Sequence, residues 1–212
     1  ILEQINPAAL LARAVNSSDS FPDSVSKAEH ANLDDTMAQL SPEETDRFNE
    51  IVKGANNIYC VGWGISSLVM ELMQIRLTIM GCRAFLCRRG GLSLWEQVRG
   101  VREGDVVIVC ELPSYAVEVT ESVEIAHRNG AKVITMTDSA AAPVCRFAEL
   151  QLNVSANSPT FGSSIIGPIF LTHVLTSSLA VSLGAEAKKS FDEQANFLHD
   201  ERIFHPIFGL KY

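Results

Sequence analysis

A glycine-punctuated turn at residues 62–67, G-W-G-I-S-S, has the composition of an anion-binding site. It joins a short apolar run, Ile58–Val61, to a long apolar stretch with helical periodicity. Where a buried strand feeds a helix in this way, the first backbone N–H groups and the positive end of the helix dipole meet at the turn. Ser66 and Ser67 fall at the helix start, where their hydroxyls can cap the helix or bind a guest. The turn therefore predicts a ligand pocket beside Gly64 and these two serines.

The same turn partly matches a dinucleotide-binding fingerprint. The third glycine of G-x-G-x-x-G is missing, and the bulky Trp63 lies inside the turn. No acidic residue ends the next strand; Arg88 and Arg89 stand there instead, as they would to recognise a 2′-phosphate. A lone G-x-G is weak evidence, so we expect no cofactor.

Catalysis in this pocket would need a positioned general base. The candidates are Glu111, Glu118, His173 and His199. Glu118 falls in the first turn of a predicted helix, where the dipole stabilises a carboxylate without any catalytic role. His173 lies on an apolar helical stretch and is expected to be a core or interface residue. We therefore assign no catalytic residue.

The elements that position these residues alternate between strands and helices from residue 58 onward. Short apolar runs predict five strands, at Ile58–Val61, Arg83–Cys87, Asp105–Cys110, Lys132–Thr137 and Glu149–Val154. Helical patterns intervene, so we expect an α/β fold with a doubly wound five-stranded parallel sheet of the flavodoxin-like type. The pocket should then lie beyond the carboxyl ends of the strands, at the topological switch point.

Two predicted helices are strongly apolar. The helix at Ser66–Met80 leaves little polar face, so we expect the sheet on one side and a second subunit on the other. The tract Pro168–Leu183 is interrupted by threonines, serines and His173. It is too short and too polar for a membrane span, and we expect a core helix.

The first 41 residues predict a helical arm. Helical patterns occupy Pro7–Val15 and Ser24–Leu40, separated by a loop, and Ser41 begins a third helix with Glu44 completing a capping box. Residues 1–50 contain ten acidic and three basic residues. An arm of this kind would pack on the domain or on a partner.

The overall charge of −8 over 212 residues lacks the basic footprint that nucleic-acid binding requires. Five cysteines without C-x-x-C spacing favour a reducing, cytoplasmic setting and argue against a metal site. Because the sequence begins with Ile1 rather than methionine, we expect it to be part of a longer chain.

Three stretches together resemble the sugar isomerase (SIS) domain. They are V-G-W-G-I-S-S at 61–67, D-V-V-I-V-C-E-L-P-S-Y-A-V-E-V at 105–119, and G-A-K-V-I-T-M-T-D-S at 130–139 with P-V-C-R-F-A-E-L-Q-L-N-V at 143–154. More narrowly, Tyr115 and the segment S-P-T-F-G-S-S-I-I-G-P at 158–168 resemble the RpiR family of bacterial transcription regulators. The likeness covers about residues 42–185, and the order and spacing of the motifs carry it.

The resemblance implies a division into a helical arm or linker at 1–41, an SIS domain at 42–185 and a C-terminal helical tail at 186–212. A helix-turn-helix domain would precede residue 1 and make all contact with DNA. The SIS domain would bind a phosphosugar effector and form a homodimer or tetramer, in the cytoplasm and without a membrane.

Carried over by position, the resemblance makes Ser66 the first-loop hydroxyl near the ligand. The loop 111–116 would cradle a phosphate, and the end of the fourth strand would line the far side. The expected ligand-binding residues are Gly64, Ser66, Ser67, Glu111, Ser114, Tyr115, Asp138 and Ser139.

The chain departs from this family pattern at Glu111 and Ala116, where a serine and a serine or threonine are usual. A carboxylate about 5 Å from a dianionic phosphate costs several kcal/mol at an effective dielectric near 20. Arg88 or Arg89 could neutralise that charge, or Glu111 could bind hydroxyls or an amine instead. In a third alternative Glu111 turns outward and the pocket is vestigial.

The leading hypothesis is an effector-binding and dimerisation domain of an RpiR-like regulator that senses a sugar phosphate or related carbohydrate derivative. The alternative is an aldose–ketose sugar-phosphate isomerase built on the same domain.

Overall fold

Five parallel strands form the centre of the chain in the computed structural model, which describes residues 6–15, 20–201 and 203. They are β1 (Ile58–Gly62), β2 (Ala84–Arg88), β3 (Val106–Glu111), β4 (Lys132–Thr137) and β5 (Leu150–Asn153), in the order β2-β1-β3-β4-β5. The predicted fold class is confirmed, with each strand within about two residues of its expected bounds. Residues 16–19 of the expected loop and the tail beyond 203 lie outside the described residues.

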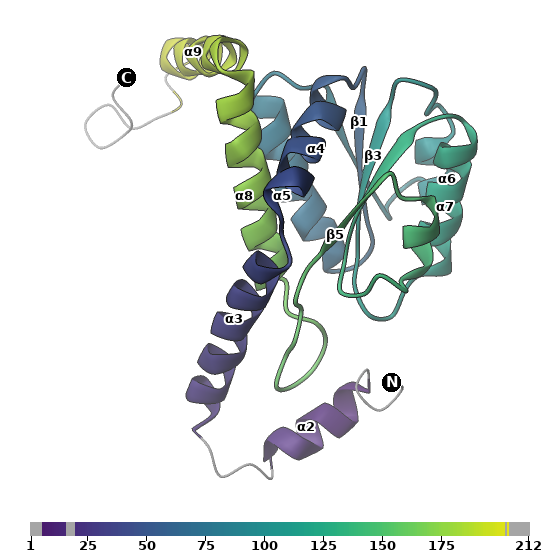
Figure 1. Cartoon of the computed structure of the whole chain (residues 1–212), viewed down its shortest axis with the longest axis vertical. Helices are drawn as coiled ribbons and strands as arrows, with labels where there is room; N and C mark the ends of the chain where they lie inside the picture. The colour runs from purple at the N-terminus through teal and green to yellow at the C-terminus, as the bar shows by residue number, and fades with distance from the viewer. Residues whose placement is uncertain (1–5, 16–19, 202, 204–212) are drawn as a thin grey trace.

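Helices cover both faces of the sheet (Figure 1). Helices α4 (Pro42–Lys53), α5 (Ser66–Ile79) and α8 (Ile166–Leu183) share one apolar core with the sheet. On the other face, α6 (Leu94–Val98), α7 (Val117–Arg128) and the 3₁₀ turn η1 (Pro143–Phe147) enclose a second core. Because both faces are buried, the central strand β3 is buried along its whole length.

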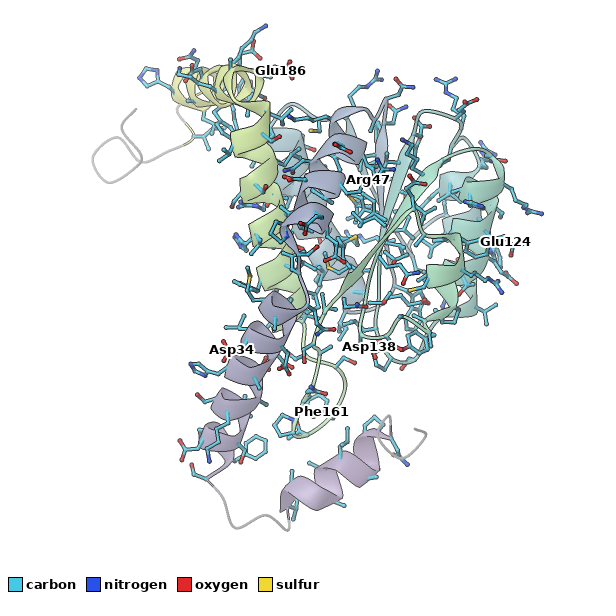
Figure 2. The ribbon with its side chains drawn as sticks, in the orientation of Figure 1. Asp34, Arg47, Glu124, Asp138, Phe161 and Glu186 are labelled. Carbon is cyan, nitrogen blue, oxygen red and sulfur yellow. The ribbon has the colours of Figure 1, made fainter. Side chains whose placement is uncertain are left out.

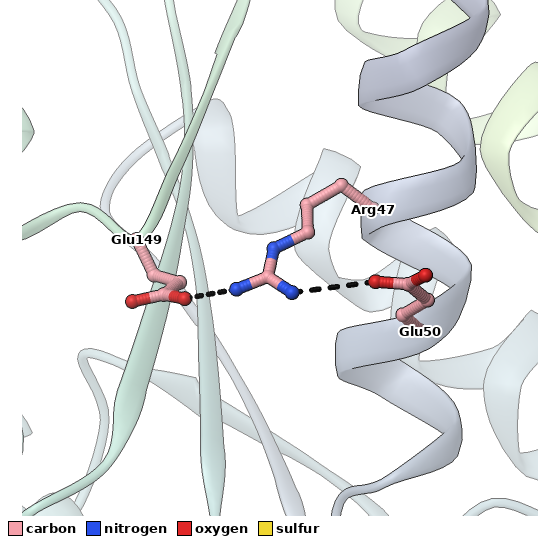
Figure 3. Close-up of polar contacts among 3 residues, drawn as sticks. All are labelled: Arg47, Glu50 and Glu149. Carbon is pink, nitrogen blue, oxygen red and sulfur yellow. Dashed lines mark hydrogen bonds and ion pairs between the residues drawn. The ribbon is translucent and has the colours of Figure 1, made fainter.

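Helix α4 begins where the sequence predicts. The Ser41 hydroxyl accepts the Glu44 N–H at 3.1 Å, and the Glu44 carboxylate accepts the Ser41 N–H at 2.8 Å. One turn further on, Arg47 lies between Glu50 and Glu149 and pairs with both (Figure 3). The capping box sets the start of the helix, and the arginine joins it to the residue preceding β5.

Helix α8 covers the side of α5 for which we expected a second subunit. The Arg76 guanidinium on α5 donates to the Thr176 hydroxyl on α8 at 2.5 Å. Leu68 and Ile75 on α5 remain 52% and 46% exposed. Helix α8 therefore covers part of that side of α5, and a second subunit over the exposed remainder stays a prediction.

Helix α8 packs against α3, α4, α5 and α9 (Ala185–Asp200). By length and composition alone it is also apolar enough to cross a membrane. Leu171, Leu175 and Leu179 are buried in the core that α8 shares with the sheet, as expected of a core helix. His173 is not a core residue: it lies on the exposed side of α8, because the buried stripe passes through Thr172 and Thr176, and an interface position stays a prediction.

The arm consists of α2 (Pro7–Val15) and α3 (Phe21–Ala38), and α3 begins three residues earlier than predicted, with Pro22 in its first turn. Buried polar side chains fix α3 to the β5–α8 loop. Asn32 accepts the Asn157 N–H at 2.9 Å and donates to the Asn157 carbonyl at 2.9 Å, while Thr36 accepts the Ser155 N–H at 2.9 Å. Helix α3 of the arm is therefore packed on the domain.

Gly62 ends β1 where the chain turns back across the start of α5. A Cβ there would lie 2.8 Å from the Ser66 carbonyl oxygen and 2.8 Å from Ser67 backbone atoms. Only glycine admits so close an approach, because real Cβ atoms do not come this near to backbone.

We expect Gly62→Ala to lower the free energy of unfolding by about 1–3 kcal/mol, since the clash is with backbone and cannot be relieved by a rotamer change. Gly91→Ala is the matched control, because a Cβ at Gly91 meets nothing within 4 Å. Urea denaturation of both variants measures the difference. Equal stabilities would show that the β1–α5 turn adapts to the extra methyl group.

Candidate functional site

A cavity of about 260 Å³ lies at the carboxyl ends of β1 and β3. Its walls are the β1–α5 turn from Trp63 to Ser66, the β3–α7 loop from Cys110 to Ala116 with Val119, and Gly162 and Ser163 of the β5–α8 loop. The strand order reverses between β1 and β3, and ligands of open α/β sheets bind at such a switch point. The predicted pocket is therefore present, at a size suited to a small ligand.

Glu111, the last residue of β3, lies in the cavity wall and is 3% exposed. Neither of its carboxylate oxygens has a hydrogen-bond partner among the described residues. Burial raises the pKa of Glu111 to about 7, an increase that the Ala116 N–H counters in part and the charge of Asp138 reinforces. The Ala116 N–H lowers the pKa of Glu111 without forming a hydrogen bond to either carboxylate oxygen in this structure. Glu111 does not turn outward, so the third alternative is wrong.

Tyr115 adopts a backbone conformation that non-glycine residues rarely use. Its φ is +28°, and the preceding Ser114 has φ +115°. The Tyr115 hydroxyl donates to Asp138 Oδ1 at 2.9 Å, which ties the β3–α7 loop to the end of β4. Burial and the bond to Asp138 both raise the pKa of Tyr115. Ser114 and Tyr115 line the cavity as expected.

Asp138 and Ser139 are not among the residues that line this cavity. Asp138 borders a neighbouring hollow with Pro113 and residues 154–157. The Ser139 hydroxyl accepts the Ala141 N–H at 3.2 Å and so stabilises its own turn. Figure 2 labels Asp138 at the edge of the sheet and Phe161 on the loop that extends past it. Asp138 affects the cavity in two indirect ways. It accepts a hydrogen bond from the Tyr115 hydroxyl, and its charge raises the pKa of Glu111.

The start of α5 is less available to an anion than its sequence suggests. The N–H groups of Ser66, Ser67 and Leu68 donate to the carbonyls three residues before them, at 3.1–3.2 Å. The Ser67 hydroxyl donates to the Gly64 carbonyl at 2.6 Å and caps no N–H group. Ser66, which is 4% exposed, lines the cavity next to Cys110.

Neither arginine at the end of β2 neutralises the cavity. Arg88 donates to Glu71 on α5 at 3.1 Å, and Arg89 is exposed. Among the described residues that line the cavity, none carries a basic side chain. The negative charge of Glu111 therefore has no cationic partner in the cavity wall.

Sequence reasoning missed two parts of the cavity wall. Trp63, whose bulk in the turn argues against a dinucleotide, lines the cavity and is 41% exposed. Gly162 and Ser163 come from the loop after β5, whose serines and glycine follow a strand end on the same edge of the sheet. The position of this loop after a strand end was the feature of the sequence that could have identified these two residues.

A scan against protein families matches the SIS domain model to residues 51–182, more than half of the chain. The chain belongs to the SIS-domain family. A curated relative, an uncharacterised helix-turn-helix type transcriptional regulator from Haemophilus influenzae, is 22% identical over 81% of this chain and 60% of its own length. The chain thus spans less than two thirds of that protein.

Solved structures show the same fold. The sugar isomerase domain of the RpiR transcription factor from Sphaerobacter thermophilus aligns with TM-score 0.79 and 24% identity over 84% of this chain and 99% of that one. NanR from Vibrio vulnificus, solved in complex with ManNAc-6P, aligns with TM-score 0.76 and 22% identity over 89% and 72%. A structure from Listeria monocytogenes described as a candidate sugar-phosphate isomerase aligns at 0.68 and 14%, over 84% and 94%.

The raised pKa of Glu111 predicts a pH dependence of stability. In the unfolded chain the carboxyl has its ordinary pKa near 4.5, so the folded SIS domain binds a proton more tightly and loses stability as pH rises from about 4.5 to above 7. Glu111→Gln removes this loss. We therefore expect the stability difference between Glu111→Gln and wild type to shift in favour of the variant between pH 5 and pH 8.5.

Urea denaturation at both pH values measures the shift, which should be about 2–3 kcal/mol. Glu121→Gln, a replacement of an exposed glutamate on α7, is the control and should show no such shift. A pH-independent difference for Glu111→Gln would mean that the buried carboxyl titrates normally.

Proposed function

We propose that this SIS domain is the effector-binding and dimerisation domain of an RpiR-like transcription regulator, which senses a carbohydrate derivative in the cytoplasm. Contact with DNA would be made by a helix-turn-helix domain outside the described residues, and the assembly would be a homodimer or tetramer. The proposal divides the chain into an arm at 1–41, the SIS domain at 42–185 and a tail at 186–212. The observation that supports this proposal is the cavity at the topological switch point of the sheet.

The likeness to regulators supports a sensing role. A curated relative and one structural neighbour are described as transcription regulators, and NanR was solved in complex with ManNAc-6P. A carbohydrate derivative is thus the ligand class to test first for this chain.

The attachment of α3 offers a route from cavity to arm. The β5–α8 loop lines the cavity through Gly162 and Ser163, and the same loop is hydrogen-bonded to α3 at each end. At its far end the Ser164 hydroxyl donates to Glu29 at 2.7 Å. A ligand that prefers one arrangement of this loop would also favour one position of α3, and so shift the population of arm positions.

Asn32→Ala should weaken the attachment of α3 to the loop, because it removes the partner of the Asn157 N–H and carbonyl at a part-buried site. We expect faster amide hydrogen exchange in α3 and in residues 155–165. Asp34→Ala, on the exposed side of α3, is the control and should leave exchange unchanged. Equal exchange rates in Asn32→Ala and wild type would contradict the proposed route.

One observation favours the isomerase alternative. Glu111 has a pKa of about 7 and lies in the cavity, so it is suited to act as a general base near neutral pH. Incubation with aldose and ketose phosphates tests this directly. Turnover that Glu111→Gln abolishes and Glu121→Gln retains would establish the enzyme, whereas we expect no turnover.

The sensing role is tested by a thermal-shift panel of neutral sugars, amino sugars, acidic sugars and sugar phosphates on the whole chain. Binding at the cavity should raise the melting temperature for at least one class, and Ser66→Val, which replaces a cavity hydroxyl by an apolar group, should reduce the shift. If no carbohydrate class stabilises the chain, the domain is not a carbohydrate sensor.

A further inference from the structure

The wall of the cavity holds a buried carboxylate that lacks hydrogen-bond partners. Glu111 presents two buried carboxylate oxygens without partners, and an ionised carboxylate can only accept. Leaving such oxygens unpaired in an apolar wall costs free energy, which a bound ligand can recover only by supplying donors. The cavity therefore needs a ligand rich in N–H or O–H groups.

Several groups that could donate to a phosphate are missing or already engaged. Three N–H groups at the start of α5 donate within the turn, and the Tyr115 N–H donates to the Leu112 carbonyl at 3.3 Å. Pro113 has no N–H, and Ala116 has no hydroxyl. These particular groups are therefore not available to hold an anion.

The charges around the cavity also oppose a phosphate. Glu111 is in the wall, and Asp138 is close enough to raise the pKa of Glu111. Arg88 is paired with Glu71. A phosphate dianion would therefore enter a region of uncompensated negative charge, while a cation would be attracted to it.

We propose that the cavity binds a small polyhydroxylated ligand that carries a protonated amine and no phosphate, with Glu111 as the counter-ion of the ammonium group. The inference rests on the proposed carbohydrate-sensing function and specifies its ligand class. The ammonium supplies three donors to the unpaired carboxylate. The hydroxyls of Ser66 and Ser114 and the ring of Trp63, all in the cavity wall, suit the hydroxyls and apolar face of a sugar ring.

The experiment is isothermal titration calorimetry of the whole chain at pH 7.5 with three hexose series. Each series holds the neutral hexose, its 2-amino derivative and its 6-phosphate: glucose, galactose and mannose with glucosamine, galactosamine and mannosamine. We expect an amino sugar of at least one series to bind about tenfold or more tightly than its neutral parent, and the 6-phosphate to bind more weakly than the parent.

Two variants make the role of Glu111 specific. Glu111→Gln keeps the shape of the side chain but removes its charge, so the amino sugar should lose about tenfold or more in affinity while the neutral parent changes little. Glu111→Ser should allow the 6-phosphate to bind, since it replaces a like charge by a hydroxyl donor. Glu121→Gln, on the outer face of α7, should behave as wild type. Circular dichroism establishes that each variant is folded.

The outcomes separate the two proposals. A 6-phosphate that binds wild type more tightly than its parent would overturn the ligand class and leave the sensing function intact. Equal affinity for an amino sugar and its parent would also overturn it, because no counter-ion would then be at work. If no member of any series binds, the carbohydrate-sensing function and the inference that rests on it both fail.

Discussion

The chemistry of the cavity depends on the carboxylate of Glu111, which is buried at the end of β3. Strand β3 lies between β1 and β4, and both faces of the sheet are covered by helices, so its six residues are all buried. Glu111 is the last of them, and its side chain has only the cavity to point into. The position of Glu111 in the fold determines how much free energy it costs to bury the charge. The neighbouring groups determine how much of that cost is offset. The raised pKa, the lack of a cationic partner and the preference for donors follow from this one position.

The fold could be predicted closely because its signals are local. Apolar runs that end in glycine or proline turns mark strands buried on both faces, and Ser41 with Glu44 marks a helix start, as the bonds between them confirm. The helix of α3 was predicted three residues short, since its first turn is formed by Phe21 and Pro22 in a stretch rich in turn residues. Proline is compatible with the first turn of a helix, where its missing N–H would have no partner within the helix, so Pro22 allows the earlier start.

The site was predicted less completely, because its polar groups depend on partners far away in sequence. Nothing near Arg88 in the sequence indicates that Glu71 on the neighbouring helix pairs with it. Nor does the sequence of the turn 62–67 show that the N–H groups at the start of α5 form hydrogen bonds within the turn. Conversely, the sequence indicated Glu111 as a departure from the family pattern but left its direction open, and the structure places it in the cavity wall. Residue type predicts what a group can do, and the fold decides whether it is free to do it.

The ion pair between Arg47 and Glu149 bears on how the sheet meets its surroundings (Figure 3). Strand β5 is an outer strand of the sheet, and an open outer strand is a template on which another chain can add. Here the strand is four residues long, and a charged pair bridges its entrance to α4. The opposite outer strand, β2, ends in Arg88, whose charge has a similar effect. Charge and shortness at the two borders of the sheet thus disfavour fibrous self-association through added strands.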